Sequence, residues 1–180
     1  MKRRMKFSLA TLLAAVAVSA AWFSHIHNSA ANQRDATVWL DSIHTGLWRY
    51  DSDPQHAGFA DPATRDSRGT VEPLFGPDYV HDIEEVLAYD PALGNLNQIA
   101  KLRKLTTLNI GSDTQLDLSA LPKLSHLKQL TIHAQGINTL EPLHHMAALD
   151  SVLIIDTPVD PNELAALKNA RPELQIQVTP

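Results

Sequence analysis

Histidine is the residue of this chain best suited to chemistry, because a neutral imidazole binds transition metals and exchanges protons near neutral pH. The sequence holds nine histidines and no cysteine among its 180 residues. Without cysteine there is no thiolate ligand, no cysteine nucleophile and no disulfide. The histidines considered for a metal site are His25, His27, His126, His133, His144 and His145. The repeat described below predicts that they point in different directions, so we expect no metal centre, and His25 with His27 is the best-placed pair.

Catalytic side chains form no known motif. The chain has no nucleophile elbow, phosphate-binding loop, dinucleotide fingerprint or HExxH sequence. Glu84 and Glu85 are adjacent, and adjacent side chains of a strand face opposite sides, so they are not expected to act as a carboxylate pair. We therefore expect a protein without enzymatic activity or cofactor. The alternative is a hydrolase with its site in the segment 52–73.

The charge of the chain argues against a nucleic-acid partner. Its 20 acidic and 15 basic residues give a net charge of -5, whereas nucleic-acid-binding domains are usually basic. Along the chain, the only basic cluster is Lys2, Arg3, Arg4 and Lys6.

An uncharged apolar stretch, Phe7–Phe23, follows these basic residues. Basic residues before an apolar run place the N-terminus in the cytoplasm and the following chain across the membrane. We predict a cytoplasmic tail at residues 1–6 and a transmembrane anchor or signal peptide at 7–26, with the rest of the chain outside the cytoplasm. Trp22 and Phe23 lie where an anchor has its interfacial aromatic residues, which favours a single-pass protein. Cleavage after Ala20 is the alternative, and it would leave a secreted or periplasmic protein.

A repeat organises the second half of the chain. The pattern LxxLxI that begins at Leu105 returns at Leu127 and, as LxxVxI, at Leu149, a step of 22 residues each time (127 − 105 and 149 − 127). The same spacing begins upstream at Ile83, and Leu174 with Ile176 is expected to continue it downstream. Three further apolar columns share the period: Leu96, Leu118 and Leu140; Ile99, Leu121 and Leu143; Leu102, Leu124 and Met146. Such a period predicts a solenoid in which each unit packs only on its neighbours.

Each unit is predicted to contain a short strand, a turn and a return segment. The fourth and sixth positions of the unit are apolar and alternate, as the inward side chains of a strand do. On the return leg, Leu140, Leu143 and Met146 are spaced by three residues, which is typical of a 3₁₀ segment. One unit alone buries too little apolar surface to offset the entropy of ordering it, so stacking must provide the stability.

These features resemble a known family. The sequence Leu127-x-x-Leu130-x-Ile132-x₄-Ile137-x-x-Leu140-x-x-Leu143-x-x-Met146 is similar to the 22-residue class of leucine-rich repeats. The last unit resembles the helical variant, in which Asp160 or Thr157 would cap a helix that is opened by Pro161 and closed before Pro172.

The ninth position of the unit departs from the family, which usually has asparagine there to satisfy backbone groups of the turn. This chain has Pro91, Asp113, Gln135 and Thr157 instead. Asp, Gln and Thr also accept hydrogen bonds, so we expect them to replace the asparagine.

The N-terminal half carries a second resemblance. Lys6–Leu13, Trp48–Asp51 and Leu74–Tyr79 are similar to a bacterial group of membrane-anchored leucine-rich-repeat proteins. That resemblance implies a short α/β solenoid of parallel strands with 3₁₀ or helical return segments, preceded by a helix–strand cap and an N-terminal transmembrane helix.

The domain boundaries follow from these patterns. Residues 27–51 are expected to form the cap, with a helix over Asn32–His44 and a strand over Leu47–Tyr50. Trp39 and Trp48 are expected in the core of this cap. Residues 52–78 are predicted to be an irregular loop or linker, and 79–180 a repeat domain of four to five units.

The outward strand positions are predicted to form a continuous concave surface. By column they are Glu85, Thr107, Gln129, Ser151 and Glu173; Leu87, Asn109, Thr131, Leu153 and Gln175; Tyr89, Gly111, His133, Ile155 and Gln177. Exposed apolar side chains among polar ones favour a protein partner. The residues predicted to bind it are Tyr89, Asn109, Thr131, His133, Leu153 and Ile155. The alternative is a structural protein of the cell envelope that associates with itself.

Overall fold

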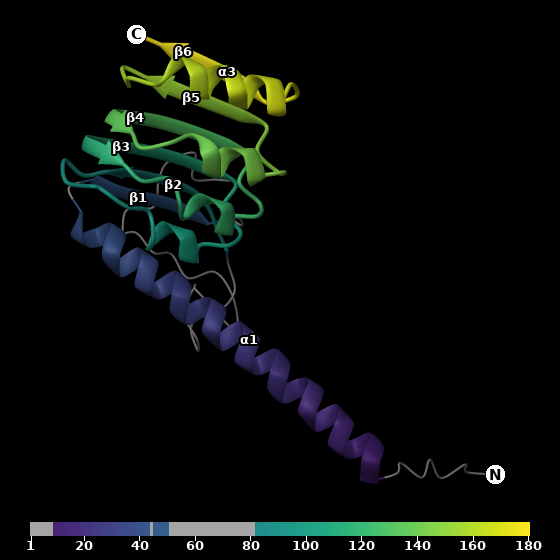
Figure 1. Ribbon diagram of the computed structural model, residues 1–180. Helices are drawn as coiled ribbons and strands as arrows, with labels where there is room; N and C mark the ends of the chain where they lie inside the picture. The colour runs from purple at the N-terminus through teal and green to yellow at the C-terminus, as the bar shows by residue number, and fades with distance from the viewer. Residues whose placement is uncertain (1–8, 44, 51–81) are drawn as a thin grey trace.

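The computed structural model describes residues 9–43, 45–50 and 82–180, and contains one six-stranded sheet with the order β1-β2-β3-β4-β5-β6 (Figure 1). β1 (Thr45–Tyr50) pairs antiparallel with β2 (Ile83–Tyr89), and every later pair is parallel. The later strands are β3 (Thr107–Leu116), β4 (Gln129–Ile137), β5 (Ser151–Ile155) and β6 (Gln175–Thr179). The return segments are the 3₁₀ helices η3 (Ile99–Lys101), η4 (Leu121–Lys123) and η5 (Glu141–His145), and the α-helix α3 (Pro161–Ala170).

The strand register confirms the 22-residue step for the central coils. Glu85 pairs with Thr107, Thr107 with Gln129, and Gln129 with Ser151. The apolar columns lie inside as predicted: Leu108, Leu130 and Val152 are each at most 2% exposed. Because each coil contributes the same positions, the coils share one continuous core.

The final step is longer than predicted. Ser151 pairs with Gln175, a step of 24 residues (175 − 151), so the expectation that Leu174 and Ile176 continue the 22-residue phase is wrong. The outward positions of the last strand are Gln175, Gln177 and Thr179, not Glu173, Gln175 and Gln177. The reason is the return segment: an α-helix rises only about 1.5 Å per residue against about 2.0 Å in a 3₁₀ helix, so α3 needs more residues to cover the same distance.

A side chain caps the N-terminus of α3, and the residue after its C-terminus binds the preceding coil. The Asp160 carboxylate accepts a hydrogen bond from the Asn162 N–H at 2.8 Å, which makes Asp160 the N-cap in place of Thr157, and Pro161 is the first helical residue. After the helix, the Arg171 guanidinium donates to the carbonyls of Met146 at 2.9 Å and Leu149 at 3.2 Å. The last coil is thereby tied to the turn of the coil before it.

A single helix, α1 (Leu9–Ser42), runs through both the predicted membrane segment and the predicted cap helix. Its C-terminal part covers the β1 end of the solenoid, where Ala36, Leu40 and Trp48 are buried. Trp39 is partly buried against the same core. Gly46 is required where the chain turns back, because a Cβ there would lie 2.0 Å from the Leu40 carbonyl oxygen.

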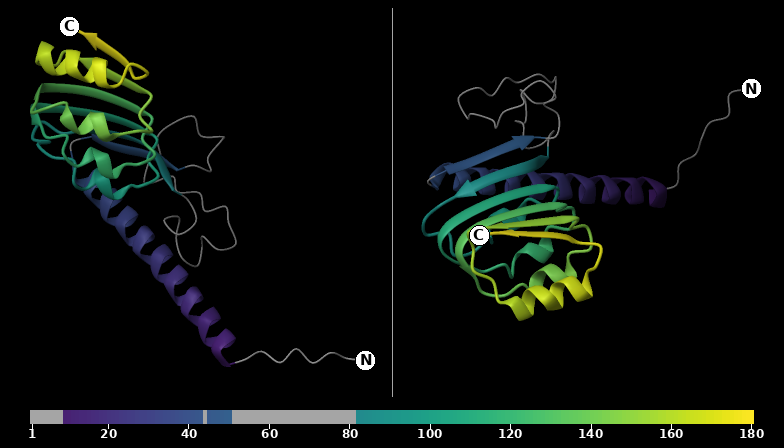
Figure 2. Two further views of the ribbon diagram at one scale, coloured as in Figure 1. Left: turned by 45° about the vertical axis from the view of Figure 1, so that its right-hand side comes forward. Right: turned by 90° about the horizontal axis from the view of Figure 1, so that it is seen from above.

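The N-terminal part of α1 projects away from the repeats (Figures 1 and 2). Apolar side chains are exposed along it: Leu13, Val16, Val18, Trp22 and Phe23. Within the described parts of the chain, no helix is both long and apolar enough to cross a membrane. Within those residues, the transmembrane helix that the sequence predicted over 7–26 is not supported. Phe7 and Ser8, with which the predicted segment begins, and the whole predicted linker, residues 52–78, lie outside the described residues.

Candidate protein-binding surface

The outward side chains of all six strands lie on the sheet face opposite the return segments. We call this the exposed sheet face; it corresponds to the surface that the sequence predicted as concave. Read along each strand, its residues are Thr45, Leu47 and Arg49; Glu85, Leu87 and Tyr89; Thr107, Asn109 and Gly111; Gln129, Thr131 and His133; Ser151, Leu153 and Ile155; Gln175, Gln177 and Thr179.

The structure brings the six predicted binding residues together on this face. Asn109, Thr131 and Leu153 are paired across β3, β4 and β5 in one row. Tyr89, His133 and Ile155 belong to the neighbouring row, in which Gly111 lies between Tyr89 and His133. Five of the six are half-buried and His133 is exposed.

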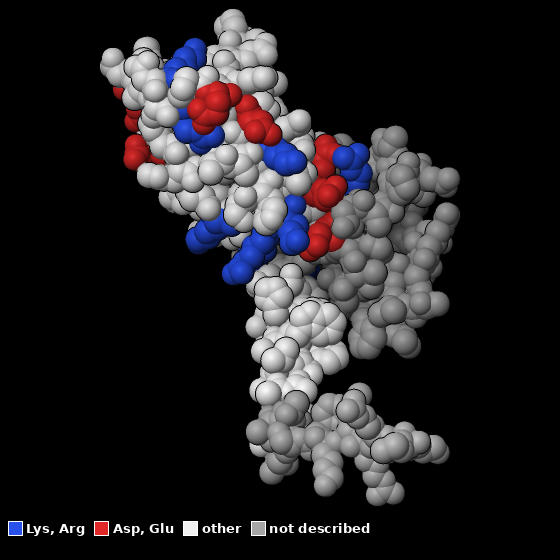
Figure 3. Space-filling model, turned by 90° about the vertical axis from the view of Figure 1, so that its right-hand side faces the viewer, with Lys and Arg blue, Asp and Glu red and all other residues white. Residues whose placement is uncertain are grey.

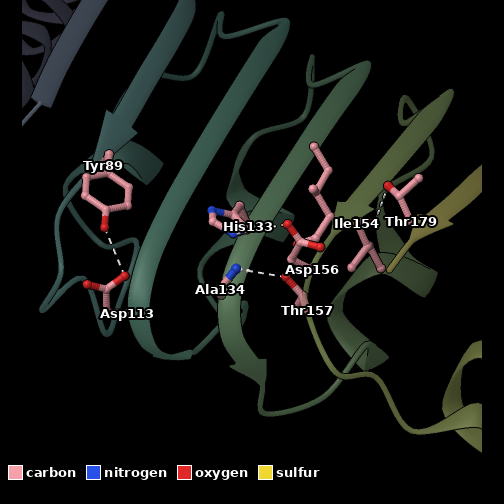
Figure 4. A network of polar contacts seen from close by, with 9 residues as sticks. Tyr89, Asp113, His133, Ala134, Ile154, Asp156, Thr157 and Thr179 are labelled. Atoms are coloured by element: carbon pink, nitrogen blue, oxygen red, sulfur yellow. Dashed lines mark hydrogen bonds and ion pairs between the residues drawn. The ribbon is translucent and has the colours of Figure 1, made fainter.

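Tyr89 lies across the face. Its ring covers Gly111, where an added Cβ would come within 2.4 Å of the Tyr89 Cδ2 atom. Its hydroxyl donates to the Asp113 carboxylate at 2.9 Å (Figure 4). This hydrogen bond, followed by desolvation and the negative charges of Asp113 and Asp90, raises the pKa of the Tyr89 phenol above its ordinary value. Gly111 therefore has a definite role: its missing side chain leaves room for the ring.

His133 has a carboxylate beside it on the next coil. Its Nε2 atom lies 3.8 Å from an Asp156 carboxylate oxygen, with the two side chains 54% and 59% exposed. Asp156 has a φ of 47°, a left-handed conformation that is uncommon for residues other than glycine. The Asp156 N–H donates to the Thr179 carbonyl at 2.9 Å. The chain thus turns sharply at the end of β5 and presents the carboxylate at the rim of the face (Figure 4).

The ninth unit position behaves differently in two coils. Thr157 is buried, and its hydroxyl accepts from the Ala134 N–H at 2.8 Å and donates to the Ile155 carbonyl at 2.7 Å. This confirms that threonine satisfies turn backbone groups in place of asparagine. Asp113 is exposed, and its carboxylate bonds the Tyr89 hydroxyl instead.

Strand β1 adds residues that were not predicted for the site. Leu47 pairs with Leu87, and Arg49 pairs with Glu85, with 2.7 Å between guanidinium nitrogen and carboxylate oxygen. The signal was present in the sequence, because a buried Trp48 requires its two neighbours to face outward. Glu85 thus lies on the exposed sheet face and Glu84, its neighbour, does not.

The histidines considered for metal binding lie apart. The His126 Nδ1 atom lies 3.0 Å from the Arg103 carbonyl, and His145 lies 3.6 Å from Glu141 on its own 3₁₀ segment. His25 and His27 are exposed on the projecting part of α1. Within the residues that the structure describes, no three His, Asp or Glu side chains gather as metal ligands would.

Together, the mostly parallel sheet, the 22-residue register and the 3₁₀ return segments define the class of fold: a short solenoid of the leucine-rich-repeat type, with α1 covering its β1 end. No protein-family model matches the chain, and no curated protein matches it. Among solved structures, the chain is similar to internalin C2 of Listeria monocytogenes, with 30% identity over 48% of this chain and a TM-score of 0.38. The match spans 37% of that protein's chain.

Proposed function

We propose that this protein is a non-catalytic binding module that holds a protein partner on its exposed sheet face. The observation that carries the proposal is the distribution of side chains on that face. Apolar residues form two separate groups on it, one of Leu47, Leu87 and Tyr89 on β1 and β2, the other of Leu153 and Ile155 on β5. The two strands between them present polar residues, among them Asn109 and Thr131.

This arrangement defines the kind of partner surface that fits. β2 and β5 are three strand spacings apart, roughly 14 Å at about 4.8 Å per spacing. A complementary protein surface has two apolar side-chain groups at that separation, with hydrogen-bonding groups between them. Apolar anchors supply most of the affinity at such a surface, and the polar middle selects among partners.

A photo-crosslinking amino acid placed at Thr131 in the full chain tests the proposal in cells. The matched control places it at Ala166, which is exposed on α3 on the return side. We expect a discrete adduct with one protein from position 131 and none from position 166. The adduct should disappear when Tyr89, His133, Leu153 and Ile155 are all changed to serine, while the thermal unfolding of the variant stays close to that of the parent. An adduct that survives this change would rule out the exposed sheet face.

A second candidate is self-association through the end of the solenoid. Val178 pairs with Ile154 of the core row, yet it is 41% exposed because β6 is the last strand of the described sheet. Sedimentation of the purified full chain separates the two candidates. A dimer that Val178→Asp dissociates would support association through β6. A monomer would rule out self-association and favour the binding module.

We also propose that the N-terminal part of the chain holds the protein at a membrane, with the repeats outside the cytoplasm. The exposed Leu13, Val16, Trp22 and Phe23 and the basic residues Lys2–Lys6 support this. Membrane fractionation combined with protease protection tests it. We expect the full chain in the membrane fraction, with the repeats digested only from the extracytoplasmic side. Mass spectrometry of the mature N-terminus distinguishes an intact leader from one cleaved after Ala20.

A further inference from the structure

Positive charge gathers on the edge of the sheet at which the parallel strands begin. Five cations belong to two neighbouring turns on this edge, which we call the basic edge: Lys101, Arg103, Lys104, Lys123 and Lys128. They are dispersed over 28 positions of the sequence, and the coil geometry brings them together. Lys101 and Lys123 occupy the same position of successive coils, and coils are about 5 Å apart. Figure 3 looks onto this edge and shows Lys and Arg side chains gathered next to the place where α1 leaves the repeats.

Most of this charge has no ion-pair partner among the residues that the structure describes. Lys101 forms an ion pair with Asp35 of α1 at 3.1 Å. Arg103, Lys104, Lys123 and Lys128 are exposed, and no ion pair joins them to another described residue. The contrast with Arg171 is clear, because that guanidinium is occupied by backbone carbonyls and Glu173. Like charges this close repel one another, which an external anion would relieve.

The position of the basic edge relative to α1 indicates what the anion is. The Lys101–Asp35 ion pair places this edge beside residue 35 of the helix. Trp22, in the exposed apolar part, lies 13 residues earlier (35 − 22), about 20 Å along an α-helix. The headgroup layer of a bilayer is roughly 5–8 Å thick on each side. Long Lys and Arg side chains and a Debye length of about 8 Å span much of the remaining distance.

We infer that the basic edge docks on anionic phospholipid headgroups and so sets the orientation of the solenoid on the membrane. The inference rests on the proposed attachment through the N-terminal part of α1. Glu84 and Asp150, which flank the two turns, limit the docking surface to the coils nearest that helix. The basic edge is formed by turns that precede the strands, and the exposed sheet face by the outward side chains of the strands. Docking through the basic edge therefore leaves the exposed sheet face accessible to a protein partner.

The experiment uses the full chain bound to vesicles of phosphatidylcholine, with or without phosphatidylglycerol. Since the chain has no cysteine, Ser125→Cys carries a single donor dye on the basic edge, and Gln135→Cys carries it at the opposite end of β4. Energy transfer to a headgroup-labelled lipid reports docking. We expect phosphatidylglycerol to increase transfer from position 125 more than from position 135, and high salt to abolish the increase.

The charge variant Arg103→Gln, Lys104→Gln, Lys123→Gln should lose that increase. Its docking constant should fall on the order of 100-fold, because each cation near an anionic bilayer contributes a factor of about five. The charge-preserving variant Arg103→Lys, Lys104→Arg, Lys123→Arg should retain it. Equal transfer with and without phosphatidylglycerol would overturn the inference. So would a wild-type chain that ignores phosphatidylglycerol but binds polyglutamate through these three residues, since the surface would then serve an acidic protein.

Cosedimentation tests the attachment separately. A full chain that fails to bind neutral vesicles contradicts the proposed attachment. If that chain still binds anionic vesicles and the charge variant does not, the basic edge binds anionic headgroups and only the proposed attachment fails.

Discussion

The two faces of the sheet come from the same strands but follow different rules. On the buried face, Leu108, Leu130 and Val152 repeat nearly the same side chain in every central coil. On the exposed sheet face, the residues that alternate with them change from Leu87 to Asn109 along one row. The buried face must be regular because every coil fits against the next, whereas the exposed face is free to vary. Variation among regular coils therefore marks the surface on which a binding function resides.

The sharpest test of this comparison uses adjacent residues of β4. Leu130→Asp buries a carboxylate in the shared core, and we expect it to unfold the coils on both sides, at a cost of at least about 4 kcal/mol. Thr131→Asp puts the same group on the exposed sheet face and should cost less than about 1 kcal/mol. Chemical denaturation measures both values. A Leu130→Asp variant with unchanged cooperative unfolding would contradict the continuous core.

The second pair compares equivalent positions of two coils. Thr157→Val leaves the buried Ala134 N–H without its acceptor, and we expect a loss of about 1–3 kcal/mol. Asp113→Ala removes an exposed acceptor and should cost less than about 1 kcal/mol. Thermal unfolding provides the comparison. Equal losses would show that burial does not determine the importance of this position.

Gly111→Ala tests the packing of Tyr89 on the exposed sheet face. The new methyl group would meet the ring at 2.4 Å, so the ring must move and its hydroxyl should lose Asp113. We expect the free energy of unfolding to fall by about 1 kcal/mol and the environment of the Tyr89 ring to change clearly. NMR of the ring protons measures the displacement, and Gly136→Ala, where the nearest atom is 3.8 Å away, is the control.

The smallest expected effect concerns the titration of Tyr89. Its pKa is raised chiefly by the hydrogen bond to Asp113, so Asp113→Ala should lower the pKa toward its ordinary value. A raised pKa in the folded state means that the contact stabilises the protein below the unfolded pKa, near 10, and is lost as pH rises through the folded pKa. Absorbance of tyrosinate against pH measures the shift. A titration curve that Asp113→Ala leaves unchanged would show that the hydrogen bond to Asp113 does not raise the pKa of Tyr89.

Much of the fold could be predicted because its signal is local and repeated. The recurrence of Leu105, Leu127 and Leu149 predicts one coil for each period, and their burial follows from the same period. The six predicted binding residues share one face because strand alternation dictates it. The length of the last coil could not be predicted, since nothing in the spacing before α3 shows how far an α-helical return segment displaces the next strand.

The sequence by itself determined the period of the central coils, their buried columns and the outward columns of the central strands, and it left the helix cap open between Asp160 and Thr157. Tertiary structure alone decided which distant residues meet. It pairs Arg49 with Glu85 across an antiparallel strand pair and places the Tyr89 ring over Gly111. It also brings Lys101, Arg103 and Lys123 together in one basic edge. The physical reason is that a solenoid converts separation along the chain into adjacency between coils. Charge that is dispersed in the sequence becomes a surface only when the coils stack.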